Sequence, residues 1–150
     1  MKQVVADATF CGAWILADES SDKAEHLLSL IVQGTLALVV PALWHYEMNN
    51  LLRSAHRRRR LSEGDAWEAL ETLSQVPLTL EDLPEEPARK RILHLALQFD
   101  LSSYDAAYLE LADRHKIPLY TADTKLNAAA KQLGLAPKYF RGIYSTLTID

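Results

Sequence analysis

Four acidic residues occupy positions from which their carboxylates could act on one substrate. Asp7 and Asp123 directly follow apolar β-branched runs, while Glu47 and Asp105 interrupt the apolar faces of two helical segments. Because ligands bind at the carboxyl ends of strands in open α/β sheets, both strand-end aspartates are expected where chemistry takes place. Each position also has a structural alternative: Asp7 and Asp123 fit helix N-caps, and Asp105 fits a capping box opened by Ser102. The four acids together favour a shared acidic site.

Glu47 is informative because hydrophobic residues flank it at helical spacing. Leu43 and Leu51 lie four residues before and after it, which places the three side chains on one face of a helix. That face is expected to contact the sheet, and no lysine or arginine lies at those spacings to pair with the carboxylate. The alternative is a snorkelling side chain whose carboxylate reaches water.

Converging carboxylates need a counter-charge. Two unit charges about 4 Å apart repel by about 4 kcal/mol at an effective dielectric constant of about 20, so a cation or raised pKa values must relieve the repulsion. Oxygen ligands favour hard ions, and the five histidines show no pair at metal-ligand spacing, so we expect Mg²⁺ or Mn²⁺. Such an ion generates hydroxide and stabilises charge on a phosphate, which predicts phosphodiester hydrolysis. Thr9 and Thr121 could orient a carboxylate or a metal-held water, and turn hydrogen bonds explain them nearly as well.

The elements that must position these acids alternate along the chain. Apolar β-branched runs recur between longer segments of helical period, which predicts an α/β fold with an open, mostly parallel sheet flanked by helices. Four strands are expected, with room for a fifth. The expected strands cover residues 3–6, 36–40, 76–80 and 119–122, and the fifth would lie around residues 139–140.

Start and stop signals divide the helical segments. Pro41 is expected to be the first residue of a helix that runs to the arginines near residue 60, and Ser62 is expected to begin the next helix. Pro84 and Pro87 precede another helical pattern, and Gly134 is expected to end the helix that follows the last strand.

Composition narrows the class of protein. The 150 residues include 20 acidic and 16 basic side chains, and this net charge of −4 argues against a general nucleic-acid coat. No linker or repeat divides the chain, so residues 1–150 are expected to form one domain. Cys11 has no partner for an intrachain disulfide, no targeting signal is recognisable, and no apolar run approaches the roughly 20 residues of a membrane-spanning helix. We therefore expect a cytoplasmic protein without a membrane partner.

A run of arginines follows the helix that carries Glu47. Arg53, Arg57 and Arg58 could contact RNA phosphates, because arginine makes bidentate, salt-sensitive contacts with them. The alternative is that cations gather at a helix C-terminus because the helix dipole and solvent favour them there.

Four segments carry a family resemblance, and each contains one of the four acids. In order and separation they resemble the PIN-domain ribonucleases, and among these the VapC-type toxins of bacterial toxin–antitoxin pairs. The segments are residues 4–9, 41–51, 104–109 and 121–126, so the resemblance spans nearly the whole chain. Where relatives often carry a glycine among the basic residues, this chain has arginine at every position from 57 to 60.

The resemblance implies a PIN-like fold and an endoribonuclease that depends on Mg²⁺ or Mn²⁺. It also implies a homodimer and a cognate antitoxin whose tail enters the active site. By matching position, Asp7 and Asp105 would be the firmest metal ligands, and Glu47 and Asp123 would complete the shell or orient water. Family members act on different RNAs, including structured transfer and ribosomal RNA.

Two other interpretations stay open on the sequence alone. A response-regulator receiver also gathers acids around Mg²⁺ at strand ends, but Asp7 follows the first strand as a single acid, and Glu47 and Asp105 would have no role. A non-catalytic PIN-like interaction module is the second alternative, and the presence of all four acids argues against it.

Overall fold

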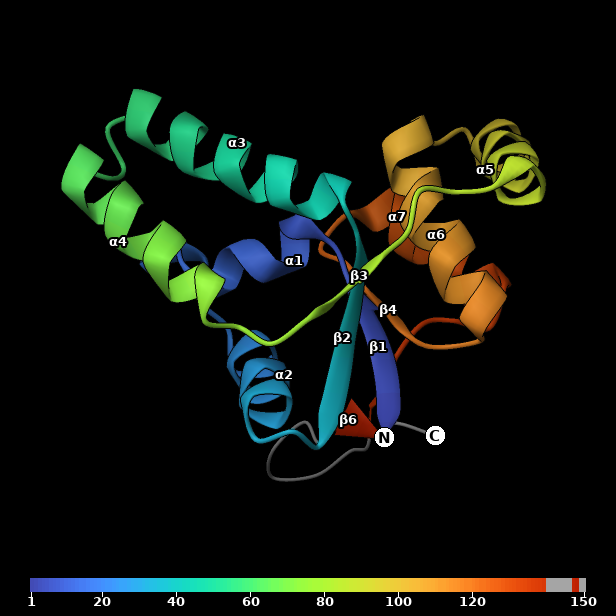
Figure 1. Ribbon diagram of the computed structural model, residues 1–150, viewed down its shortest axis with the longest axis horizontal. Helices are drawn as coiled ribbons and strands as arrows, with labels where there is room; N and C mark the ends of the chain where they lie inside the picture. The colour runs from blue at the N-terminus through green and yellow to red at the C-terminus, as the bar shows by residue number, and fades with distance from the viewer. Residues whose placement is uncertain (140–146, 149–150) are drawn as a thin grey trace.

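Four short parallel strands form the central sheet of the computed structural model, which describes residues 1–139 and 147–148 (Figure 1). The strands are β1 (Lys2–Ala6), β2 (Leu36–Pro41), β3 (Thr79–Glu81) and β4 (Leu119–Tyr120), and their order in the sheet is β3-β2-β1-β4. Helices cover both faces of a parallel sheet, so its central strands read as continuous apolar runs. Val4, Val5 and Ala6 of β1 are accordingly fully buried.

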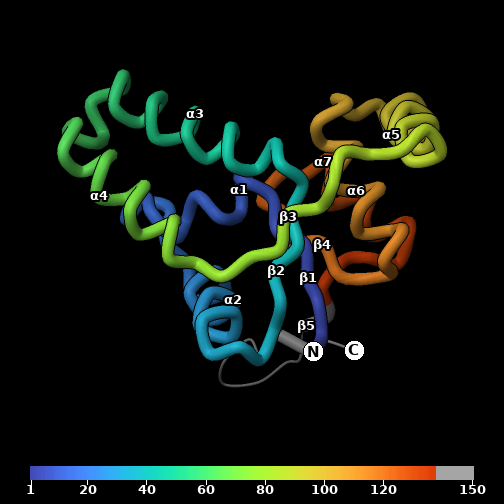
Figure 2. Tube along the Cα trace, in the orientation of Figure 1, coloured from blue at the N-terminus to red at the C-terminus, as the bar shows by residue number. Residues whose placement is uncertain are grey.

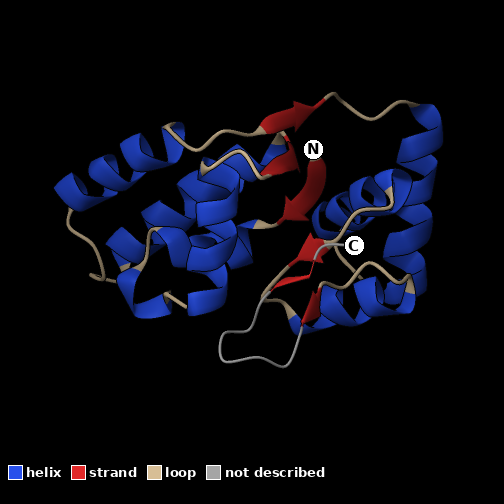
Figure 3. Ribbon diagram, turned by 90° about the horizontal axis from the view of Figure 1, so that it is seen from below, coloured by secondary structure: helices blue, strands red, loops and turns tan. Residues whose placement is uncertain are grey.

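Within the described residues, seven α-helices surround the sheet in two layers. They are α1 (Ala8–Cys11), α2 (Asp22–Val32), α3 (Leu43–Arg57), α4 (Glu63–Ser74), α5 (Glu86–Phe99), α6 (Ser103–His115) and α7 (Thr124–Gln132), and two 3₁₀ turns, η1 (Gly12–Trp14) and η2 (Ala17–Glu19), follow α1. The layers are separated along the sequence: α1 to α4 lie on one side of the sheet, and α5 to α7 lie on the other (Figures 1 and 3). Figure 2 shows α3 and α4 running side by side as a hairpin. The expected α/β class is confirmed.

The strand register brings distant parts of the chain to one edge of the sheet. Ala6 at the end of β1 pairs with Tyr120 at the end of β4, and Pro41 at the end of β2 pairs with Glu81. Because all four strands are parallel, their carboxyl ends share this edge. The residues that directly follow β1 and β4 therefore become neighbours there.

Several expected boundaries differ from the structure. The third strand begins at Thr79 rather than residue 76, and the fourth ends at Tyr120 because the next residue, Thr121, bonds to site side chains instead of a strand. Pro41 is the last residue of β2 and not the first of α3, since its fixed φ also fits the end of a strand. The fifth strand, expected at 139–140, is the segment Lys138–Tyr139, which pairs antiparallel with Leu147–Thr148 in a separate two-stranded sheet; residue 140 lies outside the described residues.

Other helix signals are confirmed. Ser62 caps α4, because its Oγ accepts a hydrogen bond from the Asp65 backbone N–H at 3.0 Å. Pro87 lies in the first turn of α5, and Gly134 follows α7 with φ of +74°, a conformation that glycine adopts without a Cβ penalty. Within the described residues, no helix is long and apolar enough to cross a membrane.

The buried stripe of α3 differs by one residue from the expected one. Trp44, Met48, Leu52 and Ala55 face the core, whereas Leu43, Glu47 and Leu51 are only partly buried. The expectation that Glu47 projects from the core-facing stripe is therefore wrong. It lies on the adjacent stripe, at the edge of the buried surface, where a carboxylate keeps access to solvent.

Candidate active site

Asp7 is the most buried of the four acids and lies at the carboxyl end of β1. It caps α1, with its Oδ1 accepting hydrogen bonds from the Phe10 backbone N–H at 3.0 Å and the Thr9 hydroxyl at 2.7 Å. Its Oδ2 accepts a third from the Thr121 hydroxyl at 2.6 Å. Burial nevertheless raises the pKa of Asp7 to about 6, with a smaller contribution from the charge of Asp105. The N-cap alternative and the site prediction are thus both compatible with this geometry.

The two threonines connect the ends of β1 and β4. Their hydroxyl oxygens lie 3.2 Å apart, and each also accepts a backbone hydrogen bond. The Ala122 N–H donates to Thr9 Oγ1 at 3.1 Å, and the Asp123 N–H donates to Thr121 Oγ1 at 3.0 Å. The role expected for these threonines, orienting a carboxylate, is therefore visible at Asp7.

Asp123 is the N-cap of α7 and lies beside this pair of threonines. Its Oδ1 accepts a hydrogen bond from the Leu126 backbone N–H at 2.8 Å. The side chain is partly buried, and its charge raises the pKa of Asp105. Asp123 thus lies close enough to Asp105 for the two carboxylates to repel each other.

Asp105 occupies the third position of α6, as the capping-box alternative expects. Its backbone N–H donates to Ser102 Oγ at 3.1 Å. Burial raises the pKa of the half-buried Asp105 carboxyl, and repulsion from Asp123 raises it further. The charge of Asp105 in turn raises the pKa values of Asp7 and Glu47.

Glu47 approaches Asp7 and Asp105 from α3. The hydroxyl of Tyr108, a fully buried residue of α6, donates a hydrogen bond of 2.8 Å to Glu47 Oε1. Burial raises the pKa of Glu47, the charges of Asp7 and Asp105 raise it further, and the Tyr108 hydrogen bond opposes the rise. Tyr108 is not among the site residues that the sequence predicts. Its position on α6, three residues after Asp105, was the available signal for a role at the site.

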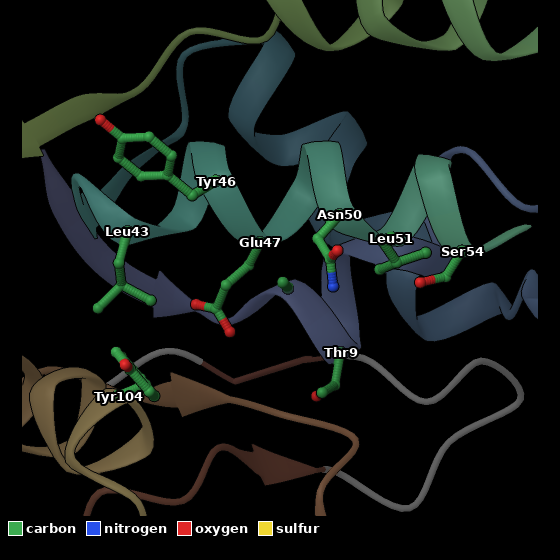
Figure 4. Close-up of a pocket in the computed structure, with 9 residues that line it drawn as sticks. Thr9, Leu43, Tyr46, Glu47, Asn50, Leu51, Ser54 and Tyr104 are labelled. Atoms are coloured by element: carbon green, nitrogen blue, oxygen red, sulfur yellow. The ribbon is translucent and has the colours of Figure 1, made fainter.

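A pocket of about 600 Å³ opens beside these residues (Figure 4). Leu43, Tyr46 and Tyr104 lie toward one end, Asn50 and Ser54 lie toward the other end along α3, and Glu47 and Thr9 lie between them. Ala8 and Leu51 complete the lining among the described residues, which includes neither arginine nor lysine. Of the four acids, Glu47 lines the pocket directly.

The donor set of this site suits a hard divalent cation. All four candidate ligands offer carboxylate oxygens, and the burial and repulsion that raise three of their pKa values are relieved by a bound positive charge. Within the described part of the chain, no three His, Cys, Asp or Glu side chains lie close enough together to hold an ion as they stand. That spacing is compatible with Mg²⁺, which usually keeps several waters and binds through one or two carboxylates.

The arginines lie apart from the carboxylates. Arg53, Arg57 and Arg58 are exposed, and Arg57 is ten residues along α3 from Glu47, which corresponds to about 15 Å of helix. Arg60 differs from these three arginines because it forms an ion pair with Asp18 at 2.7 Å.

The turn after α3 contains an arginine in the region where relatives often carry glycine. Arg59 has φ of +60°, so this arginine adopts the left-handed conformation that glycine usually supplies at the end of a helix. The local turn is therefore formed without glycine.

Comparison with known proteins agrees with this geometry. The model of the PIN domain family matches residues 4–132, a range that contains all four acids. The chain belongs to the PIN-domain family. Ribonuclease VapC3 of Pyrobaculum aerophilum is 32% identical to this PIN domain over 125 residues, which cover 83% of this chain and 92% of that protein. Family membership removes the receiver alternative.

Solved structures also resemble this PIN domain. PAE2754 from Pyrobaculum aerophilum has a TM-score of 0.64 at 25% identity, covering 85% of this chain and 84% of its own. VapC20 of Mycobacterium tuberculosis, a toxin that cleaves the sarcin–ricin loop, has a TM-score of 0.58 at 17% identity, covering 84% of this chain and 94% of its own. At that identity the second likeness bears on the fold alone, and it confirms the expected PIN-like architecture.

Proposed function

We propose that this PIN domain, extending over residues 1–150, is a metal-dependent endoribonuclease and the toxin component of a toxin–antitoxin pair. The observation that carries the proposal is the arrangement at the carboxyl edge of the sheet, where Thr121 of the β4 end bonds to Asp7 and Tyr108 of α6 bonds to Glu47 of α3. The relationship to a protein named ribonuclease VapC3 over most of both chains supports the same activity.

Asp7 and Asp105 are the proposed principal ligands of Mg²⁺ or Mn²⁺, with Glu47 and Asp123 completing the shell or orienting water. When bound, the ion supplies a hydroxide nucleophile and stabilises the charge that develops on the scissile phosphate. Thr9 and Thr121 hold the two oxygens of Asp7 in place by donating hydrogen bonds to them.

Glu47 is suited to orienting the attacking water. Tyr108 donates a hydrogen bond to Oε1, which fixes the carboxylate and leaves Oε2 to accept a proton from water. Because Glu47 also lines the pocket, a phosphate held there lies within reach of this carboxylate.

RNA contacts by Arg53, Arg57 and Arg58 are part of the proposal. The α3 face that lines the pocket through Asn50 and Ser54 continues to residues 57 and 58 at helical spacing. An RNA strand leaving the pocket along this face meets their guanidinium groups. Alanine at Arg57 should lower the salt dependence of RNA binding by about one counterion while leaving the fold intact.

We further propose a cognate antitoxin, a homodimer and a cytoplasmic site of action. The VapC relationship supports the antitoxin, and the intracellular location of RNA supports the cytoplasm. Leu93 and Leu97, spaced four residues apart on α5, are 61% and 75% exposed and could contribute to a dimer contact.

Cleavage of RNA by the purified protein tests the proposal. With Mg²⁺ or Mn²⁺ present we expect endonucleolytic cleavage of an RNA mixture, its loss in EDTA, and its loss in Asp7→Asn and Asp105→Asn variants that retain the wild-type circular dichroism spectrum. Glu71→Gln, an exposed change on α4, is the matched control and should cleave as the wild type does. Cleavage that survives either aspartate substitution would contradict the assigned site, and a folded wild type that cleaves no RNA would favour the non-catalytic interaction module.

A further inference from the structure

Two exposed tyrosines flank the pocket, and each directly precedes a site acid. Tyr46 is followed by Glu47 on α3, and Tyr104 is followed by Asp105 on α6. Their side chains are 76% and 68% exposed, although tyrosine rings are usually largely buried in folded proteins. Core packing therefore does not explain why tyrosine occupies these two positions.

Both tyrosines line the same pocket from different elements. Tyr46 and Tyr104 line the 600 Å³ pocket together with Leu43, and Figure 4 shows the three at the same end, beside Glu47. Leu43 and Tyr104 also line a second pocket of about 400 Å³. Neither tyrosine hydroxyl forms a hydrogen bond within residues 1–139 and 147–148. The rings thus present apolar surface and a polar tip directly next to the carboxylates.

The side chains at this end of the pocket favour contact with RNA bases over contact with RNA phosphates. Among the described residues, the first pocket has no cationic lining side chain and one charged one, Glu47, so this lining offers a phosphate no positive charge of its own. An RNA base, in contrast, is uncharged and planar, and it stacks on an aromatic ring whatever its sequence. A base held on a double helix is already stacked and cannot also cover a protein ring.

We propose that Tyr46 and Tyr104 are positioning residues that stack against unpaired bases next to the scissile phosphate. The inference rests on the proposed ribonuclease function and adds two residues to it, which hold bases beside the cleaved bond. The aromatic end holds bases, the carboxylates hold the phosphate through the metal, and the arginines at the far end of α3 hold the strand that leaves the pocket.

Binding and cleavage are measured separately, so that the two proposals can fail independently. Binding is followed by fluorescence anisotropy with a short unstructured RNA labelled with fluorescein, and with the same RNA annealed to its complement. These measurements use Ca²⁺ in place of Mg²⁺, and the RNA is checked afterwards to be intact. Cleavage of the unlabelled single strand in Mg²⁺ gives kcat and KM. The variants are Tyr46→Ala, Tyr104→Ala, the corresponding phenylalanine variants, and Trp67→Ala as a control, because Trp67 is 66% exposed but lines a different pocket.

We expect each tyrosine-to-alanine change to weaken single-strand binding about fivefold to a hundredfold and to raise KM, with an unchanged thermal melt. Phenylalanine should restore binding, because stacking needs the ring and not the hydroxyl. Trp67→Ala should bind as the wild type does, and duplex RNA should bind more weakly than the single strand and equally to all variants.

Alanine variants that bind and cleave the single strand like the wild type would overturn the stacking proposal while leaving the ribonuclease intact, and would leave a protein partner as the occupant of the two rings. Tyrosine-dependent binding without cleavage would support stacking and contradict the proposed nuclease. Equal losses for Trp67→Ala and the tyrosine variants would also refute it, since a specific site requires that the control differ.

Discussion

Replacing Asp7 with asparagine should stabilise the metal-free protein, although it removes a site carboxylate. Asp7 is 2% exposed, and burial raises its pKa from an ordinary value of 3.8 to about 6. One pKa unit corresponds to about 1.4 kcal/mol, so ionising Asp7 in the folded protein costs about 3 kcal/mol more than ionising it in the unfolded chain. An uncharged amide avoids that cost.

The hydrogen bonds around Asp7 can be kept in the variant. The amide oxygen of asparagine accepts from the Phe10 N–H and the Thr9 hydroxyl, as Asp7 Oδ1 does now. The amide NH₂ then donates to Thr121 Oγ1, and the Thr121 hydroxyl turns to donate to Thr9 Oγ1, which lies 3.2 Å away. Asparagine is also as good an N-cap as aspartate, so α1 keeps its cap.

The sign of the pH dependence follows from the raised pKa. At a pH below about 4, Asp7 is protonated in both the folded and the unfolded wild type, and the variant gains nothing. Between a pH of about 4 and about 6, the unfolded chain ionises Asp7 while the folded protein keeps it protonated, so the wild type loses stability until the folded state is ionised as well. The variant shows no such loss, so its advantage should grow to at most about 3 kcal/mol, or roughly 6–12 °C in Tm, at pH 8.

Urea denaturation in EDTA, followed by tryptophan fluorescence at pH 4, 6 and 8, measures this difference. The m-value should stay unchanged, which shows that the same surface is exposed on unfolding. Glu71→Gln removes one exposed carboxylate and should change stability little at any pH. A variant that is no more stable than the wild type at pH 8 would refute the reasoning that burial outweighs the three hydrogen bonds at Asp7.

Three further predictions concern the site and its supporting turn. Tyr108→Phe should raise the pKa of Glu47 and move the acidic limb of the cleavage pH–rate profile to higher pH, because the hydrogen bond that favours the ionised glutamate is lost; an unmoved limb would exclude Glu47 as the titrating group. Arg59→Gly should stabilise the protein by up to about 1 kcal/mol in urea, since φ is +60°, whereas Arg58→Gly, where φ is −83°, should destabilise it. Mg²⁺ at about 100 times its Kd should stabilise the wild type by about 2.7 kcal/mol and the Asp7→Asn variant by less, as measured by thermal melts; equal shifts would contradict a role for Asp7 as a ligand.

The sequence predicted the strands and the chemistry better than the orientation of α3. Four apolar runs identified the four strands, because strands covered on both faces are apolar throughout. The stripe assigned to the core of α3 was shifted by one residue, since Leu43 and Leu51 also match the spacing, and only the fully buried Trp44 and Met48 show which stripe faces the sheet. Spacing alone does not separate a core-facing stripe from the one beside it.

The partners of the site acids were harder to predict than the acids themselves. The hydrogen bond from Tyr108 to Glu47 joins residues 61 positions apart, and the bond from Thr121 to Asp7 joins residues 114 positions apart. Such contacts depend on how α3 and α6 pack and on the pairing of β1 with β4. Local sequence contains the residue types, and only the fold brings them together.

The strand order also determines when this molecule can become active during its synthesis. β1 lies between β2 and β4, so one of its edges has no neighbour until residues 119–120 have been translated. Asp7 and Glu47 emerge early, but Asp105 and Asp123 lie in the last third of the chain. A nascent chain on the ribosome therefore holds half of the acids without the sheet that unites them. Assembly of the site therefore waits until β4 and Asp123 have been translated.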